Sequence, residues 1–351
     1  MKKEPKKYRR CLLLAGGGGR LGAHLGVYAA ACEAGQAPDV VFGTCGGALI
    51  AALIHAESDP ARQLAFLAGP GMYRFWCSVK TRRAVFVMGA LSALILRGLD
   101  WRYAPFIPDL DREALFEVTG SLPPLHWRKN DDGIDAVLLG ARLLYRAPEV
   151  GRPRAGKPLF EAVAIGPSRA CSLLESAIAA TGSGPHMHSA VKQTVATLHA
   201  QELPLQDAVR ISLADMFYLQ PADTAGARWL GGAVDLIPVE LASRMANEVW
   251  TDQKDPVPRW TMAPAWRSVL GIDAAQRQRQ VDSAQIALRV DNRGLSRALP
   301  ESVLHRRLAV SRSGLQISLR ACASEADYRR VILAQFNEGR RRARVAIENL
   351  R

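Results

Sequence analysis

Short apolar runs alternate with glycine-rich turns through the first part of the chain. Residues 12–15 predict a strand and residues 21–34 a helix that ends at Gly35. After a short linker, residues 40–42 predict a second strand and residues 48–56 a second helix. Each predicted strand therefore leads through glycines directly into a helix.

The later part of the chain has weaker patterns. The predicted elements are a short helix over 136–147, a central strand over 159–165, a helix over 171–181, a strand over 316–319 and a C-terminal helix over 326–350. Residues 84–96 are apolar and have basic residues on both sides. A membrane-spanning helix needs about 20 apolar residues, so this run is too short to span. It predicts either a buried helix or a lid-like interfacial helix.

The two glycine turns carry the candidate chemistry. Four consecutive glycines, residues 16–19, let the backbone approach a ligand and direct N–H groups at it. The second turn places Cys45 between small residues, where a strand passes into a helix, and this is the layout of a nucleophile elbow. The positive end of that helix predicts a thiolate at Cys45 rather than a thiol.

These turns resemble the motifs of the patatin-like phospholipase family, which are a GGGxRG oxyanion loop, a GxSxG elbow and a later DGG or DGA. The first is matched by residues 16–20, the second by residues 43–47 and the third by residues 230–232. Residues 210–215, which lead to Pro221, resemble the segment that precedes the third motif. The resemblance covers roughly residues 10–240. It implies a three-layer α/β/α sandwich with a central, mostly parallel sheet, and an oxyanion loop made of Gly17, Gly18, Gly19 and Arg20.

Each motif departs from the family pattern. Leu21 stands where the oxyanion loop has glycine, Cys45 replaces the nucleophilic Ser, and Leu230 replaces the catalytic Asp. A leucine can neither orient a nucleophile nor take its proton, so the family dyad is absent. The possible substitute bases are Asp235, Asp215 and His24. His24 has the alternative of a packing role on the first helix.

Composition and charge point to anionic partners. The 351 residues carry a formal net charge of +13, which attracts phospholipid head groups or nucleic acid through basic patches. No known nucleic-acid module is present, so we favour lipid. The apolar run after the basic N-terminus is shorter than the roughly 7–15 residues of a signal peptide. Six scattered cysteines without a CxxC pair suit reduced thiols, so we expect a cytoplasmic protein, free or peripheral at a membrane.

The predicted organisation is a basic tail (1–10), a patatin-like domain (11–245) and a C-terminal extension (246–351) that packs on the same domain. Trp250, Trp260 and Trp266 suit a membrane interface, single-stranded nucleic acid or a loop over the sheet. His186 and His188 lack a third and fourth ligand, so we expect a surface loop and no metal. No cofactor is expected, and we make no prediction of oligomeric state.

Two hypotheses for function remain open. In the first, Cys45 attacks acyl esters or thioesters of lipid metabolism and forms a thioester. Because Leu230 cannot activate water, deacylation is slow, unless the acyl group passes to a better nucleophile or another base assists. In the second, the protein is a pseudoenzyme that binds lipid or a protein partner.

Overall fold

The structure is a computed structural model. It describes residues 6–16, 19–81, 99–128, 133–181, 189–255, 262–299, 302–311 and 314–350. The apolar run over 84–96, His186, His188 and Trp260 lie outside these ranges, so the predictions for them stay predictions.

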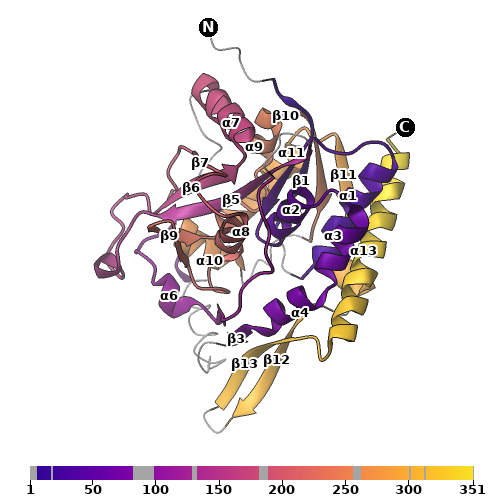
Figure 1. The fold of residues 1–351 in the computed structure, drawn as a ribbon. Coiled ribbons are helices and arrows are strands. Elements are labelled where there is room, and N and C mark those ends of the chain that lie inside the picture. The colour runs from indigo at the N-terminus through magenta and orange to yellow at the C-terminus, as the bar shows by residue number, and fades with distance from the viewer. Residues whose placement is uncertain are drawn as a thin grey trace.

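Strands and helices alternate over much of the chain (Figure 1). The strands are β1 (Tyr8–Leu14), β2 (Val40–Thr44), β3 (Val79–Thr81), β4 (Phe116–Val118), β5 (Asp135–Leu143), β6 (Phe160–Gly166), β7 (Ala196–His199), β8 (Ala222–Thr224), β9 (Ala227–Leu230), β10 (Ala246–Gln253), β11 (Leu288–Asp291), β12 (Leu304–Ser311) and β13 (Gly314–Ala321). The helices are α1 (Leu21–Glu33), α2 (Gly46–Ala56), α3 (Pro60–Leu67), α4 (Pro70–Cys77), α6 (Leu110–Glu113), α7 (Ser168–Thr181), α8 (Leu205–Leu213), α9 (Val239–Met245), α10 (Met262–Leu270), α11 (Ala274–Ser283), α12 (Leu295–Ala298) and α13 (Glu325–Glu348), with short 3₁₀ turns η1 (Ala147–Glu149) and η2 (Gly232–Val234).

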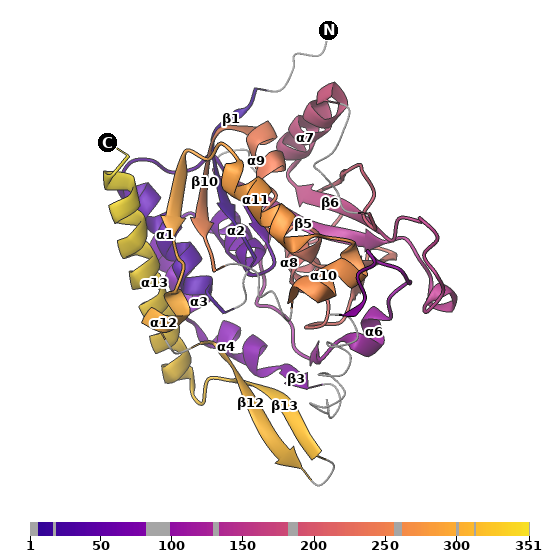
Figure 2. The ribbon, with the colours of Figure 1, turned by 180° about the vertical axis from the view of Figure 1, so that it is seen from behind.

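Nine strands form one sheet in the order β11-β10-β1-β2-β5-β6-β7, with β9 pairing β5 and β8 pairing β9. Its β11-β10-β1-β2-β5 part is parallel throughout, and β6 joins β5 in the antiparallel sense. The strands β12 and β13 form a separate hairpin that extends away from the sheet (Figure 2). The predicted central, mostly parallel sheet is confirmed.

Helices cover both faces of this sheet. Alternate residues of β1 point to opposite faces, so Leu12 and Leu14 enter one apolar core and Cys11 and Leu13 enter the other. The first core lies under α1, α2 and α8, and the second under α7, α9 and α10. This arrangement is the predicted α/β/α sandwich.

The last helix packs directly on the first. A β-carbon at Gly26 of α1 would lie 2.2 Å from the Phe336 carbonyl oxygen of α13, and one at Gly22 would lie 2.4 Å from that of Ile332. A β-carbon at Gly339 of α13 would in turn lie 2.3 Å from the Ala23 carbonyl oxygen. The two backbones therefore touch because glycines stand at the crossing.

Several predicted elements differ from the structure. The sequence predicts a helix over 136–147, but residues 136–143 belong to strand β5, which is buried between β2 and β6. A short apolar run fits a buried strand as well as a helix, so its pattern alone misleads. Trp250 lies in strand β10, and not in a loop, while Trp266 lies on α10.

The predicted boundaries fall within packed structure. Tyr8 and Arg10 of the predicted basic tail are buried in strand β1. The boundary at residue 245 lies between α9 and β10, and β10 pairs with β1. The region after residue 245 thus supplies two strands of the main sheet as well as α13.

Candidate active site

Cys45 occupies a sharp turn between β2 and α2. Its φ of 51° and ψ of −121° are a strained backbone conformation for a residue with a side chain. The turn fits because a β-carbon at Gly43 would lie 2.5 Å from Ala48 Cα, and one at Gly47 would lie 2.0 Å from the Leu14 carbonyl oxygen. The residue at this elbow is buried, with 7% of its surface exposed.

Two hydroxyl groups hold the strands around this turn. Ser212 Oγ accepts a hydrogen bond from the Cys45 backbone N–H at 3.0 Å and donates to the Leu139 carbonyl oxygen at 2.6 Å. Thr44 Oγ1 accepts from the Gly16 N–H at 2.7 Å and donates to the Leu236 carbonyl oxygen at 2.8 Å. The elbow, the start of the glycine loop and the third motif are therefore linked by hydrogen bonds.

The buried Asp215 carboxyl group lies close enough to the Cys45 thiol for each group to shift the pKa of the other. Its Oδ1 atom is buried and has no hydrogen-bond partner among the described residues. Burial raises the pKa of Asp215 to about 6, although the nearby Cys45 thiol, the Ala233 N–H and the charge of Lys254 oppose the shift. The carboxyl group therefore titrates within the range in which a general base works near neutral pH.

Leu230, by contrast, is part of the apolar core. It ends strand β9, pairs with Ala141 of β5 and is fully buried. The neighbouring Gly231 leaves room for the carboxyl group, because a β-carbon there would lie 2.9 Å from Asp215 Oδ1. A carboxyl group thus lies next to the third motif, but it comes from the segment after α8.

The pKa of the Cys45 thiol is raised well above its ordinary value, so the predicted thiolate is wrong for the resting site. Burial is the largest cause, followed by the negative charge and the closeness of the Asp215 carboxylate. The Gly46 N–H at the start of α2 and the charge of Lys254 act in the opposite direction. The positive end of the helix is therefore outweighed by burial and a neighbouring carboxylate.

The glycine loop is anchored by two side chains from distant elements. Lys254 Nζ, just after β10, donates to the carbonyl oxygens of Ala15 and Gly16. Gln335 Nε2 of α13 donates to the Gly19 carbonyl oxygen at 2.5 Å. Of the predicted oxyanion residues, Gly17 and Gly18 lie outside the described residues.

Arg20 and two of the predicted bases lie beside charged groups away from Cys45. Arg20 Nη2 pairs with Asp255 at 3.0 Å. His24 Nδ1 lies 3.4 Å from Asp252 Oδ2, and burial lowers the pKa of this histidine to about 4. Asp235 pairs with the Arg277 guanidinium at 3.0 Å. Among the three candidate bases, the structure brings Asp215 to Cys45.

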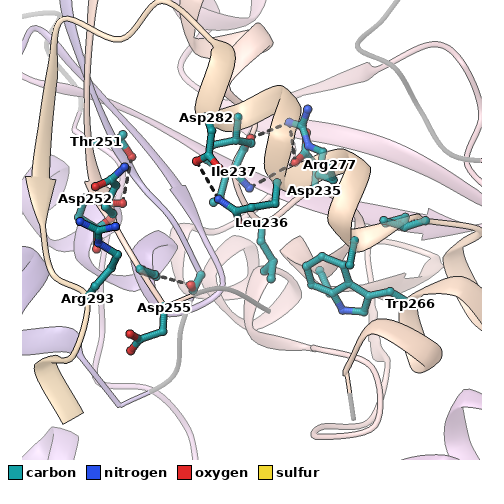
Figure 3. Close-up of a pocket in the computed structure, with 18 of the residues that line it drawn as sticks. Asp235, Leu236, Ile237, Thr251, Asp252, Asp255, Trp266, Arg277, Asp282 and Arg293 are labelled. Atoms are coloured by element: carbon teal, nitrogen blue, oxygen red, sulfur yellow. Dashed lines mark hydrogen bonds and ion pairs between the residues drawn. The ribbon is translucent and has the colours of Figure 1, made fainter. Parts of the chain in front are cut away.

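Gly16 also lines a cavity of about 180 Å³, part of whose lining is drawn in Figure 3. Asp235, Leu236 and Arg277 line one part of it, and the end of β10 lines another. Gly16 connects this cavity to the elbow, because a β-carbon there would lie 3.0 Å from Cys45 Cβ. Its lining mixes apolar side chains with paired charges.

Two residues beside Cys45 and the glycine loop, Ser212 and Lys254, were not among the predicted site residues. Ser212 lies in the segment 210–215, whose family resemblance could have drawn attention to it. Lys254 lacks such a signal, since only the pairing of β10 with β1 brings it to the glycine loop. Within the described ranges, no group of three or more His, Cys, Asp or Glu side chains is placed to hold a metal ion.

One family profile matches this chain. The family profile described as patatin-like phospholipase matches residues 12–243. Among solved structures, VipD from Legionella pneumophila is similar over 97% of this chain and 67% of its own, with 12% identity and a TM-score of 0.36. No curated protein matches the chain. The profile match spans well over half of the sequence, and the chain belongs to the patatin-like phospholipase family.

Proposed function

We propose that this protein is an acyl hydrolase of lipid metabolism in which Cys45 is the nucleophile and Asp215 is the base. The observation that carries the proposal is the position of the Asp215 carboxyl group beside the Cys45 thiol. The family acts on lipids, so the substrate class is an acyl ester or thioester.

The first half of the reaction forms a thioester. Asp215 takes the thiol proton while Cys45 Sγ bonds to the carbonyl carbon, which gives a tetrahedral oxyanion. When the oxyanion collapses, the bond to the leaving group breaks, and that group receives the proton from Asp215. Because the resting thiol is protonated, a base in contact with it is needed, as it is for a serine hydroxyl.

The second half returns the enzyme to its starting state. Asp215 takes a proton from water as the water oxygen bonds to the thioester carbon. The carbon–sulfur bond then breaks, the fatty acid leaves, and Sγ regains the proton. The Gly46 N–H lies next to Cys45 Sγ at the start of α2, where it is placed to donate to the oxyanion.

Intact-mass measurement with short-chain p-nitrophenyl esters and acyl thioesters tests this proposal. The wild type should gain one acyl group or release product steadily, and Cys45→Ala should do neither. Asp215→Asn should lower the acylation rate by about 100-fold, the lower end for loss of a general base. In the wild type the rate should fall as the pH drops below about 6, because Asp215 is then protonated.

Two control variants sharpen the result. Asp223→Asn removes an exposed carboxylate and should acylate like the wild type. Cys77→Ala removes an exposed thiol and should leave the adduct in place. If the wild type gives neither adduct nor turnover, the proposal is wrong and a binding role without catalysis replaces it.

A further inference from the structure

Exposed apolar side chains gather in one short segment. Of the six large apolar side chains that are exposed among the described residues, four lie within residues 99–106. They are Leu99, Trp101, Tyr103 and Phe106, and the exposed fraction of Trp101 is 79%. A surface of this kind commonly marks a site of interaction.

Arginine side chains accompany these residues. The exposed Arg102 guanidinium pairs with Asp100 at 2.9 Å and lies 5.3 Å from the Phe106 ring centre, and that of Arg267 lies 5.4 Å from the Trp101 ring centre. Exposed Arg152 follows on the neighbouring loop. We call Leu99, Trp101, Arg102, Tyr103, Phe106 and Arg152 the Trp101 surface.

Backbone hydrogen bonds fix this surface to the body of the protein. The Ile107 N–H donates to the Arg152 carbonyl oxygen at 3.0 Å, and the Gly151 N–H donates back to Ile107 at 2.9 Å. The Ala104 N–H donates to the Arg267 carbonyl oxygen of α10 at 2.9 Å. The exposed rings are therefore held outward by an ordered support.

This support lies at the carboxyl end of the parallel strands, which is the end where Cys45 follows β2. Thr44 at the end of β2 pairs with Leu139 of the parallel strand β5, which runs on to Leu143 before the loop that carries Arg152. At about 3.3 Å per residue, β5 extends some 13 Å beyond the end of β2. Figure 1 shows this β5–β6 connection reaching outward beside α6.

We propose that the Trp101 surface docks on an anionic phospholipid bilayer. Trp and Tyr rings favour the interface between lipid and water, and arginines nearby attract anionic head groups. A net charge of +13 acts in the same sense over a longer range. The inference rests on the proposed function, because a bilayer held at the carboxyl edge of the sheet would supply lipid esters on the side of Cys45.

Vesicle flotation tests the proposal independently of catalysis. The full chain carrying Cys45→Ala is mixed with vesicles of phosphatidylcholine, with or without phosphatidylglycerol. It should float with the anionic vesicles, and the further pair Trp101→Ser and Arg102→Glu should reduce binding at least about tenfold. The matched control pair, Leu350→Ser with Arg330→Glu, changes an exposed apolar and an exposed basic residue at α13 and should bind like the parent.

The outcomes separate the two proposals. If the parent binds and the Trp101 surface pair does not, docking is supported even if Cys45 proves to have no chemistry. Equal binding by all variants, or no binding by a folded parent, overturns it. A dimer that is lost in the Trp101 surface pair, without binding to vesicles, would assign the surface to a second copy of the chain instead.

Discussion

The Cys45 thiol and the Asp215 carboxyl group can each lose a proton, and they lie buried close to each other. The raised pKa of Asp215 means that the folded protein binds its proton more tightly than the unfolded chain does, where the value is near 3.8. Asp215 therefore favours folding most below that value, and its contribution falls as pH rises from about 4 to about 6. At neutral pH the carboxylate that the proposed mechanism requires is a cost to stability.

The variant Asp215→Asn should thus be more stable than the wild type at pH 7.5. The increase in the free energy of unfolding should reach up to about 3 kcal/mol, since about two pKa units separate the folded and unfolded states. Urea unfolding at pH 7.5 and at pH 4 measures the difference, which should vanish at the lower pH. A variant less stable than the wild type at pH 7.5 would contradict it, and Asp223→Asn serves as the exposed control.

The turn at Cys45 could be predicted from the sequence, but which candidate base lies near it could not. The spacing of Gly43, Gly46 and Gly47 is local, so the elbow could be predicted and its backbone has the expected strain. The pairing of Asp215 with Cys45 joins residues far apart in sequence, and it depends on where α8 ends over β5. The ionisation of Cys45 depends on burial, which the helix-dipole argument left out.

Among the elements, α11 holds the loop that follows the third motif. Arg277 of this helix is buried and donates to Asp235, to Glu240 and to the Ile237 carbonyl oxygen. Removal of the guanidinium leaves a buried carboxylate without its positive partner. Breaking this ion pair is therefore costly, even if apolar residues at the same positions would stabilise the protein equally well.

Arg277→Met should lower the free energy of unfolding by about 3 kcal/mol at neutral pH. Arg279→Met, on the exposed side of the same helix, should change it by less than about 0.5 kcal/mol. Denaturant unfolding of both variants provides the measurement. Similar values for the two would mean that the Arg277 pairs add no stability to this loop.

Element type was predictable where the apolar pattern was long or bounded by glycines. The predicted helices over 21–34 and 326–350 correspond closely to α1 and α13. The helix prediction for 136–147 was wrong because a strand that is buried on both faces lacks the alternation of apolar and polar residues. Only its pairing with β2 and β6 shows what it is.

On the scale of the whole molecule, α13 completes the helical layer over α1. It buries four large apolar side chains, those of Tyr328, Val331, Ile332 and Ile347. At about 2 kcal/mol each, they contribute about 8 kcal/mol, which is comparable to the whole stability of a typical domain.

A chain that stops at residue 323 should therefore fail to fold cooperatively. Circular dichroism and thermal melting would show a broad or absent transition, and a peptide of residues 324–351 should restore part of it. A chain that stops at Glu348 keeps the packed helix and should melt like the full protein. A sharp wild-type melt from the shorter chain would show that α13 is dispensable for folding.

Strand β1 lies between β2 and β10 in the sheet, so this part of the protein can fold completely only after β10 has been synthesised. During synthesis, β1 and β2 leave the ribosome early, but the other edge of β1 stays open until residues 246–253 emerge. The face of α1 that carries Gly22 and Gly26 stays uncovered even longer, until α13 has been synthesised. Such distant pairings delay the final fold and leave an exposed strand edge on the nascent chain. We therefore expect the growing polypeptide to depend on chaperones until α13 has been synthesised.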